Sequence, residues 1–200
     1  MKKTTMLLSA LVVAGAAFAA AQALVGQPAP DFTATDTKGQ PETLSSFKGK
    51  WVVLEWTNSE CPFVQKHYNS GNMQKLQKTY TDKGVTWLSI NSSAKGKEGY
   101  VDAAGANALT AKRGATPTAF LLDPAGAVGR LYGAKATPHM FVIDPSGKIV
   151  YQGAIDDKPS TDLEDVKTAK NYVSSALDEA MAGKPVTKTS SQPYGCSVKY

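Results

Sequence analysis

Cys61 is one of only two cysteines in the 200-residue chain, and it follows a nearly continuous apolar run. Pro62 comes next and suits the first turn of a helix, because its missing N–H would have no partner there. The unpaired N–H groups at a helix N-terminus favour an ionised thiol, which is the nucleophilic form. The segment therefore predicts a reactive thiol at a helix start.

The second cysteine, Cys196, lies near the end of the chain in a polar stretch. Two cysteines in an oxidising compartment usually pair, so a structural Cys61–Cys196 disulfide is one interpretation. In the chain-entropy model such a long loop stabilises the fold by about 5 kcal/mol. The other interpretation is thiol exchange, with Cys196 on a flexible tail folding back over the helix start.

The N-terminal residues predict export. Lys2 and Lys3 precede an apolar run from Met6 to Ala21, and Ala21-Gln22-Ala23 offers a small-x-small cleavage site. The run is shorter than the roughly 20 residues of a membrane span. We therefore expect a signal peptide at 1–23, a domain at 24–182, a polar tail at 183–200, and a periplasmic protein with no membrane anchor after cleavage.

Composition narrows the classes of partner. The formal net charge is +5, and arginine occurs only as Arg113 and Arg130. No dense basic cluster could follow a phosphate backbone, so nucleic acid is not an expected partner. The length suits one domain with a sound core.

Hydrophobic patterning predicts alternating strands and helices. Residues 51–57 and 85–91 read as buried strands. A helix broken near 69–71 follows Cys61, another covers 101–113, and a short helical piece covers 127–133. Two near-copies, 114–126 and 135–147, each read as Thr-Pro, an apolar strand and an Asp-Pro-x-Gly turn. The second copy continues through 148–152 as a hairpin.

The last helix is expected to begin at a Thr161–Glu164 capping box and to end at Gly183, with Leu163 and Val166 on its apolar face. The whole pattern predicts an α/β sandwich with a mixed sheet.

Three segments resemble the redoxin branch of the thioredoxin-like superfamily, which includes alkyl hydroperoxide reductase/thiol-specific antioxidant proteins. They are APDF at 29–32, WVVLEWTNSECPFV at 51–64 and TPHMFVIDPSGKIVYQG at 137–153. The likeness covers about 25–181 and is greatest to a peroxiredoxin-like subgroup with one cysteine at the first CxxC position. It implies a thioredoxin-like sandwich, in which helices flank a central mixed sheet.

The resemblance also implies roles for individual residues. Glu55 matches the buried carboxylate that precedes the first cysteine in thioredoxins. It would shuttle the thiol proton, or else be a hydrogen-bonded glutamate without that role. Thr137-Pro138 matches the cis-proline site, with Thr116-Pro117 as the competing pair. The expected substrate-binding residues are Thr137, Pro138, Pro62 and Trp56.

Peroxidase activity is less expected, because the positions that activate peroxide in peroxiredoxins differ here. The Thr/Ser and Pro positions hold Asn58 and Leu54, the peroxidatic cysteine position holds Val64, and the arginine position falls on Pro138. The expectation of antioxidant activity therefore rests on the family resemblance alone.

The sequence favours an exported thiol–disulfide oxidoreductase, with Cys61 as nucleophile and Cys196 as resolving cysteine of a redox-active centre. Protein or small-molecule thiols and disulfides are the expected partners, with a membrane or periplasmic electron donor and no cofactor. The alternative is a non-catalytic binding module with a structural disulfide. In a metal-handling form of this alternative, a soft metal would be held by Cys61, His139 and Met140. Lys66 and His67 are expected at the surface.

Overall fold

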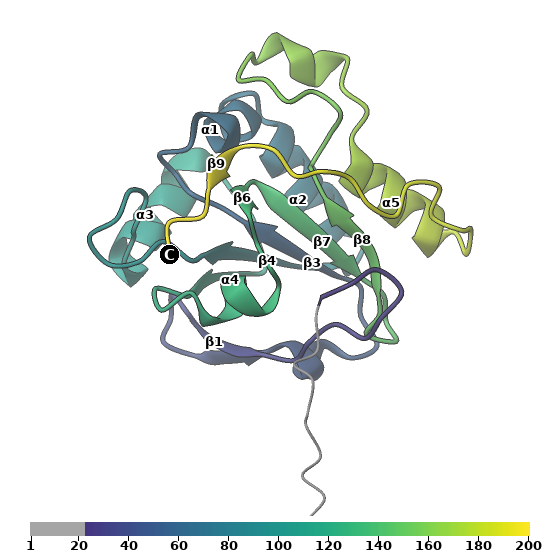
Figure 1. Cartoon of the computed structure of the whole chain (residues 1–200), viewed down its shortest axis with the longest axis horizontal. Helices are drawn as coiled ribbons and strands as arrows, with labels where there is room; N and C mark the ends of the chain where they lie inside the picture. Colours follow the sequence, from purple (N-terminus) through teal and green to yellow (C-terminus); the bar gives the residue numbers. More distant parts are fainter. Residues whose placement is uncertain (1–22) are drawn as a thin grey trace, which may run out of the picture.

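A seven-stranded mixed sheet forms the centre of the protein (Figure 1). The computed structural model describes residues 23–200, so all but Ala23 of the expected signal peptide lies outside the described residues. The sheet order is β2-β1-β5-β4-β3-β7-β8. Its strands are β1 (Thr33–Asp36), β2 (Pro41–Thr43), β3 (Val52–Trp56), β4 (Thr86–Asn91), β5 (Ala119–Leu122), β7 (His139–Ile143) and β8 (Ile149–Gly153).

The middle of the sheet combines parallel and antiparallel pairing. Strand β3 runs parallel to β4, with Glu55 opposite Ser89, and antiparallel to β7, with Glu55 opposite Met140. Strands β4 and β5 are also parallel. Every residue of β3, β4 and β7 is buried, as the continuous apolar runs predicted for strands covered on both faces.

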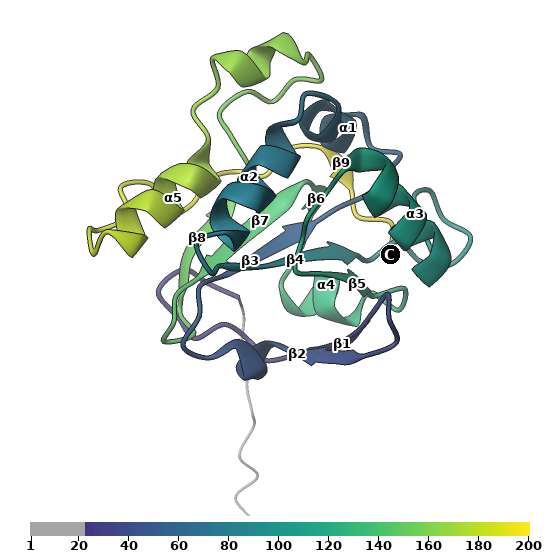
Figure 2. The same ribbon diagram turned by 180° about the vertical axis from the view of Figure 1, so that it is seen from behind.

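Helices cover both faces of this sheet (Figures 1 and 2). They are α1 (Pro62–Asn69), α2 (Asn72–Thr81), α3 (Ala103–Arg113), α4 (Ala127–Leu131) and α5 (Tyr172–Met181), with short 3-10 turns η1 (Leu44–Phe47) and η2 (Glu164–Lys167). Helices α2 and α5 lie side by side, and the Tyr80 hydroxyl donates to Asp178 between them at 3.0 Å. The expected α/β sandwich with a mixed sheet is confirmed.

Two core clusters, one on each face, follow from the alternation of side chains along the strands. Val53 belongs to the cluster beneath α1, α2 and α5, which also contains Cys61. Leu54 and Trp56 belong to the opposite cluster, which includes Val128 of α4. This alternation decides which residues can meet Cys61.

The two near-copies form the same strand and turn but continue differently. Gly126 N–H donates to Asp123 O after β5, and Gly147 N–H donates to Asp144 O after β7, each at 2.8 Å. The first copy then enters α4, whereas the second enters the hairpin strand β8. These are the continuations that the sequence predicted.

The expected start of the last helix is wrong. Helix α5 begins at Tyr172, and the Asn171 side chain accepts from Ser174 N–H as its N-cap. The expected capping box belongs instead to a 3-10 turn, where the Asp162 carboxylate accepts from Glu164 N–H at 2.9 Å. Local side-chain bonds of this kind compete with helix formation, and Leu163 is left exposed.

The tail, residues 183–200, returns across the molecule and docks (Figure 1). Its first part is exposed, but Ser190 bridges Gln152 at the sheet edge. Farther on, β9 (Cys196–Ser197) pairs with β6 (Ala136–Thr137) in a separate two-stranded sheet. The tail is polar, as predicted, yet backbone pairing and side-chain contacts hold its second half in place.

Candidate active site

Cys61 occupies the N-cap of α1, and Pro62 is the first helical residue. Its backbone is extended, and its carbonyl accepts the first helical hydrogen bond, from Gln65 N–H at 2.9 Å. The side chain is fully buried, and its thiol donates to Thr137 O at 3.1 Å. The structure therefore puts the first cysteine at a helix start and against the segment that precedes β7.

Thr137 and Pro138 form the wall opposite Cys61. The Thr137–Pro138 peptide bond is cis, and among residues 23–200 no other cis bond occurs. The choice of this pair over Thr116–Pro117 is therefore confirmed. Both residues are buried, and the carbonyl of Thr137 faces the Cys61 thiol.

Cys196 reaches the same place from the tail. Residues Thr137 and Cys196 are direct partners in the antiparallel β6–β9 pair. The Cys196 side chain is half-buried and packs against the core cluster that contains Cys61. Both cysteines are free thiols in this structure, and the fold brings them together although they lie far apart in the sequence.

The pKa values of the two thiols are shifted in opposite directions. Burial by itself raises the pKa of Cys61, but hydrogen bonds from the Cys196 and Thr137 side chains and from the Val64 and Cys196 backbone outweigh it, so that pKa is lowered. Burial and then the interaction with Cys61 raise the pKa of Cys196 to about 12. The first proton therefore leaves Cys61, and Cys196 stays protonated beside the resulting thiolate.

Glu55 points to the face of the sheet that carries Cys61, and it lies at the centre of a buried hydrogen-bond network. Its carboxylate accepts from the hydroxyl of Tyr68 at 2.8 Å, the indole of Trp87 at 2.8 Å, the hydroxyl of Ser89 at 2.9 Å and the amide of Gln77 at 3.2 Å. Burial raises the pKa of Glu55 above its ordinary value although these donors oppose the shift. The network joins α1, α2, β3 and β4.

The other two expected site residues occupy different surroundings. Pro62 is exposed next to Cys61. Trp56 is fully buried on the opposite face, where its indole donates to Ser92 Oγ at 3.1 Å. The structure does not bring Trp56 to Cys61, because strand alternation turns it away, and we assign it to the core.

The surface positions expected for Lys66 and His67 are wrong, since both side chains are buried. Lys66 Nζ donates to Lys158 O at 2.7 Å, and His67 Nε2 contacts the Tyr194 hydroxyl at 3.2 Å. That hydroxyl also donates to the buried carboxylate of Asp156. The sequence held no local signal for this cluster, because Tyr194 comes from the tail.

Burial, followed by the charge of Lys66, lowers the pKa of His67 to about 3. His67 is therefore neutral at pH 7, and its approach to Asp156 at 3.9 Å is a contact of a neutral ring with a carboxylate. The cluster holds Tyr194 two residues before Cys196. It fixes the tail where it passes α1.

The metal-site interpretation finds no support in the side-chain directions. Met140 lies in the cluster of Cys61, but His139 points to the other face of the sheet and packs against Phe141, with 4.7 Å between the ring centroids. Within residues 23–200 no group of three or more His, Cys, Asp or Glu side chains is arranged to hold a metal. Nor does any helix in that range have the length and apolar character of a membrane span.

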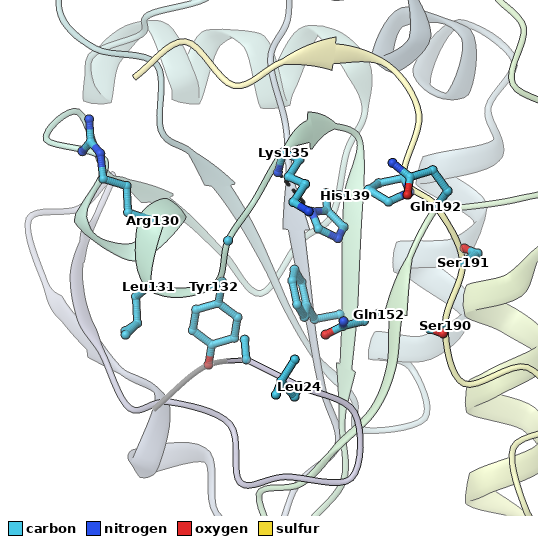
Figure 3. Close-up of a pocket in the computed structure, with 14 residues that line it drawn as sticks. Leu24, Arg130, Leu131, Tyr132, Lys135, His139, Gln152, Ser190, Ser191 and Gln192 are labelled. Atoms are coloured by element: carbon cyan, nitrogen blue, oxygen red, sulfur yellow. Dashed lines mark hydrogen bonds between the residues drawn. The ribbon is translucent and has the colours of Figure 1, made fainter. Parts of the chain in front are cut away.

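A cavity of about 630 Å³ lies on the His139 side rather than at Cys61 (Figure 3). His139, Gln152 and Tyr132 line it, and the tail closes one side through Ser190 to Pro193. Neither cysteine borders it, so the size of a pocket is a poor guide to the chemistry here. The Cys61 thiol is instead buried beside β9.

A helix-capping thiol opposite a cis-proline, on a mixed sheet covered by helices, defines a protein of the thioredoxin-like class. Within that class the chain belongs to the redoxin family, whose model matches residues 24–172. The redoxin resemblance inferred from the sequence is confirmed. The peroxiredoxin-like subgroup is not confirmed.

A curated relative, "Thiol-disulfide oxidoreductase ResA" of Geobacillus kaustophilus, is 36% identical over 67 residues, which is 34% of this chain and 37% of the relative. The match therefore spans little more than a third of that protein's length. Among solved structures, an uncharacterized conserved protein from Geobacillus kaustophilus has a TM-score of 0.75 at 26% identity, covering 89% of this chain and 93% of its own. A candidate DsbE thiol:disulfide interchange protein from Chlorobium tepidum has a TM-score of 0.53 at 30% identity, covering 64% and 83%.

Proposed function

We propose that the protein is a thiol–disulfide oxidoreductase in which Cys61 is the nucleophile and Cys196 the resolving cysteine. The observation that carries the proposal is the pairing of Cys196 opposite Thr137, whose carbonyl also accepts from the Cys61 thiol. Two neighbouring thiols, one with a lowered pKa and one with a raised pKa, suit sequential exchange because they ionise in turn. The names of the partial relatives, thiol-disulfide oxidoreductase and thiol:disulfide interchange protein, agree with this class of reaction.

The reaction proceeds in two exchanges. The Cys61 thiolate attacks one sulfur of a substrate disulfide, a Cys61–substrate bond forms, and the other sulfur leaves with the electron pair as a thiolate. Cys196 then loses its proton and attacks the Cys61 sulfur, which releases the second substrate thiolate. The substrate disulfide is reduced to two thiols, and the protein pair is oxidised to a Cys61–Cys196 disulfide.

Glu55 enters this proposal as the buried acid that exchanges a proton with the site. Burial raises the pKa of Glu55 above its ordinary value, so the carboxyl holds its proton more readily than an exposed glutamate and could pass it on during exchange. Its network also fixes α1 over β3 through Tyr68. The second role is positional and is independent of proton transfer.

The proposed place of action is the periplasm, after cleavage of the segment 1–23. The lysines and apolar run at the start of the chain support this proposal. Protein or small-molecule disulfides would be the substrates, and a membrane or periplasmic donor would return the protein to its dithiol form. Peroxidase activity is disfavoured by Asn58 and Leu54 at the peroxide-activating positions.

A structural disulfide is the competing function of the cysteine pair, and the reduction potential separates the two. A potential below about −300 mV indicates a structural bond, whereas a higher value indicates exchange. We expect the higher value, because the hydrogen bonds that lower the Cys61 pKa stabilise the reduced form.

Trapping of mixed disulfides tests the proposed roles. In Cys196→Ser protein recovered from cells, non-reducing electrophoresis should reveal adducts of Cys61, because the resolving thiol is gone. Cys61→Ser should carry none. If the Cys196→Ser protein runs only as free monomer with a Cys61 that reacts freely with a thiol probe, the role of Cys196 as resolving cysteine is wrong.

A further inference from the structure

The edge of β6 carries a strand that belongs to the tail rather than to the main sheet. Strand β9 pairs with β6 over two residues, and its Cys196 lies directly opposite Thr137. Within residues 23–200 the strand β6 pairs with no other strand. An extended segment with a cysteine is thus held at the Cys61 site by backbone pairing.

This segment blocks the approach to Cys61. The Cys61 side chain has 0% exposure, and the thiol contacts Thr137 and Cys196. A disulfide of another molecule cannot reach a sulfur that has no exposed surface. Exchange with an external substrate therefore requires β9 to leave the β6 edge.

The residue before the cysteine must be very small. A Cβ on Gly195 would lie 2.0 Å from Thr137 O and 2.8 Å from Thr137 C. Both neighbours are backbone atoms of a buried residue, so they cannot give way as a flexible side chain would. Only glycine fits there while the strand keeps its register.

The position before the glycine has a polar recess of its own. The Tyr194 ring lies 5.8 Å from the Phe63 ring and 5.5 Å from Lys66 Nζ. Its hydroxyl donates to Asp156 and lies 3.2 Å from His67 Nε2. Phenylalanine would fill the space but would leave Asp156 without this donor.

The tail has the properties of a segment that can be released. Residues 183–190 are mostly exposed, with Thr187 hydrogen-bonded to Glu179, and residues 191–200 are only half-buried or exposed. A two-residue strand pair is a short connection compared with the core strands. Tyr200, whose hydroxyl donates to Ala134 O at 2.9 Å, remains a second attachment beyond it.

We propose that the β6 edge is a binding site for an extended Tyr-Gly-Cys segment of a partner polypeptide, and that β9 occupies it as a tethered competitor. This inference rests on the proposed function. It adds the sequence that the site recognises in a partner and the requirement that β9 leave the β6 edge before the partner binds. The partner class is a polypeptide with a solvent-accessible disulfide in an extended Tyr-Gly-Cys context.

The probe is the peptide Gln-Pro-Tyr-Gly-Cys-Ser-Val, blocked at both ends, with its cysteine in a mixed disulfide with thionitrobenzoate. In full-length Cys196→Ser protein, the Cys61 thiolate attacks the peptide sulfur, and the coloured aromatic thiolate leaves with the electron pair. The absorbance rise gives the rate. Matched peptides carry alanine in place of the glycine or phenylalanine in place of the tyrosine.

The glycine peptide should react about tenfold faster than the alanine peptide, with the phenylalanine peptide between them. Adding Gly195→Ala to Cys196→Ser should displace β9 and raise the rate with the glycine peptide about tenfold. Gly183→Ala is the control for a new side chain elsewhere in the tail, because its φ is also positive but its Cβ would meet open space, and it should leave the rate unchanged.

Equal rates with the glycine and alanine peptides, alongside normal reaction with a small aromatic disulfide, would overturn the binding site while leaving the proposed function intact. An unchanged rate in the Gly195→Ala protein would overturn the role of β9 as competitor. Failure of Cys61 to react with any disulfide, in a protein with native circular dichroism, would overturn the proposed function as well.

Discussion

At the residue scale, hydrogen bonds surround the Cys61 thiol, and the second thiol, Cys196, lies beside it. Cys61, Thr137 and Pro138 could be predicted from the sequence, because a helix-start pattern and a family motif mark them locally. The burial of Lys66 and His67 could not be predicted. Their partners, Asp156 and Tyr194, are brought to α1 only by the tertiary fold.

Two substitutions of Cys196 separate its hydrogen bond from its redox role. Cys196→Ala removes the side chain whose hydrogen bond is the leading influence that lowers the Cys61 pKa, so that pKa should rise. Cys196→Ser keeps a hydroxyl donor and should give a smaller rise. The ultraviolet absorbance of the thiolate, titrated with pH in both proteins, measures the difference. Identical titrations would show that Cys196 does not set the acidity of Cys61.

At the scale of elements, β9 and the rest of the tail connect the surroundings of Cys61 to α1 and β8. The sequence predicted a polar tail that folds back over the helix start, but it did not predict the strand β9, because a two-residue strand carries no periodic pattern. The same limit applies to α5, whose start depends on Asn171 rather than on the Thr161–Glu164 box. In both places short polar contacts, invisible to periodicity, decide the backbone path.

Tyr194→Phe tests how strongly the tail is docked. Loss of the hydroxyl leaves the buried Asp156 carboxylate short of a donor, so the free energy of unfolding should fall by about 1–3 kcal/mol. Urea denaturation measures this change, and faster labelling of Cys196 by a thiol probe reports release of β9.

Tyr172→Phe is the matched control, because within residues 23–200 the Tyr172 hydroxyl makes no hydrogen bond, although its ring stacks near Tyr151 at 6.4 Å. Its loss should change stability by less than about 0.5 kcal/mol. Equal effects of the two substitutions would contradict a docking role for the Tyr194 hydroxyl.

At the scale of the whole molecule, both histidines of the chain are buried in neutral form. Burial lowers the pKa of His67 to about 3 and that of His139 to about 4, compared with an unfolded value of 6.5. Between pH 4 and 6.5 the histidines therefore bind protons in the unfolded chain but not in the folded chain. Stability must fall as the pH falls through this window.

The expected slope is up to about 2.7 kcal/mol per pH unit for two protons. Glu55 opposes this slope. Because its pKa is raised, the folded state keeps a proton above pH 4.5 that the unfolded state loses. Urea denaturation across this window measures the net slope. His139→Gln retains an acceptor for Lys135 N–H and should reduce the slope by up to about 1.4 kcal/mol per unit. An unchanged slope would mean that His139 is protonated in the folded state.

The oxidation state of the cysteine pair ties the stability of the whole chain to its redox function. A Cys61–Cys196 bond closes most of the domain into one loop and, in the chain-entropy model, stabilises the fold by about 5 kcal/mol. By a thermodynamic cycle, any extra stability of the oxidised form appears as a lower reduction potential, at about 30 mV for each 1.4 kcal/mol. A redox-active pair therefore needs interactions that stabilise the reduced form.

The lowered pKa of Cys61 supplies such an interaction, and its pH dependence can be tested. A thiol whose folded pKa is depressed adds stability as the pH rises through that pKa toward the unfolded value of 9.0. The stability of the reduced protein should thus rise relative to the oxidised protein between neutrality and pH 9.0. Urea denaturation of both forms measures the gap, with Cys61→Ser as a control whose stability lacks this rise. A constant gap of about 5 kcal/mol at every pH would instead identify a structural disulfide and overturn the exchange mechanism.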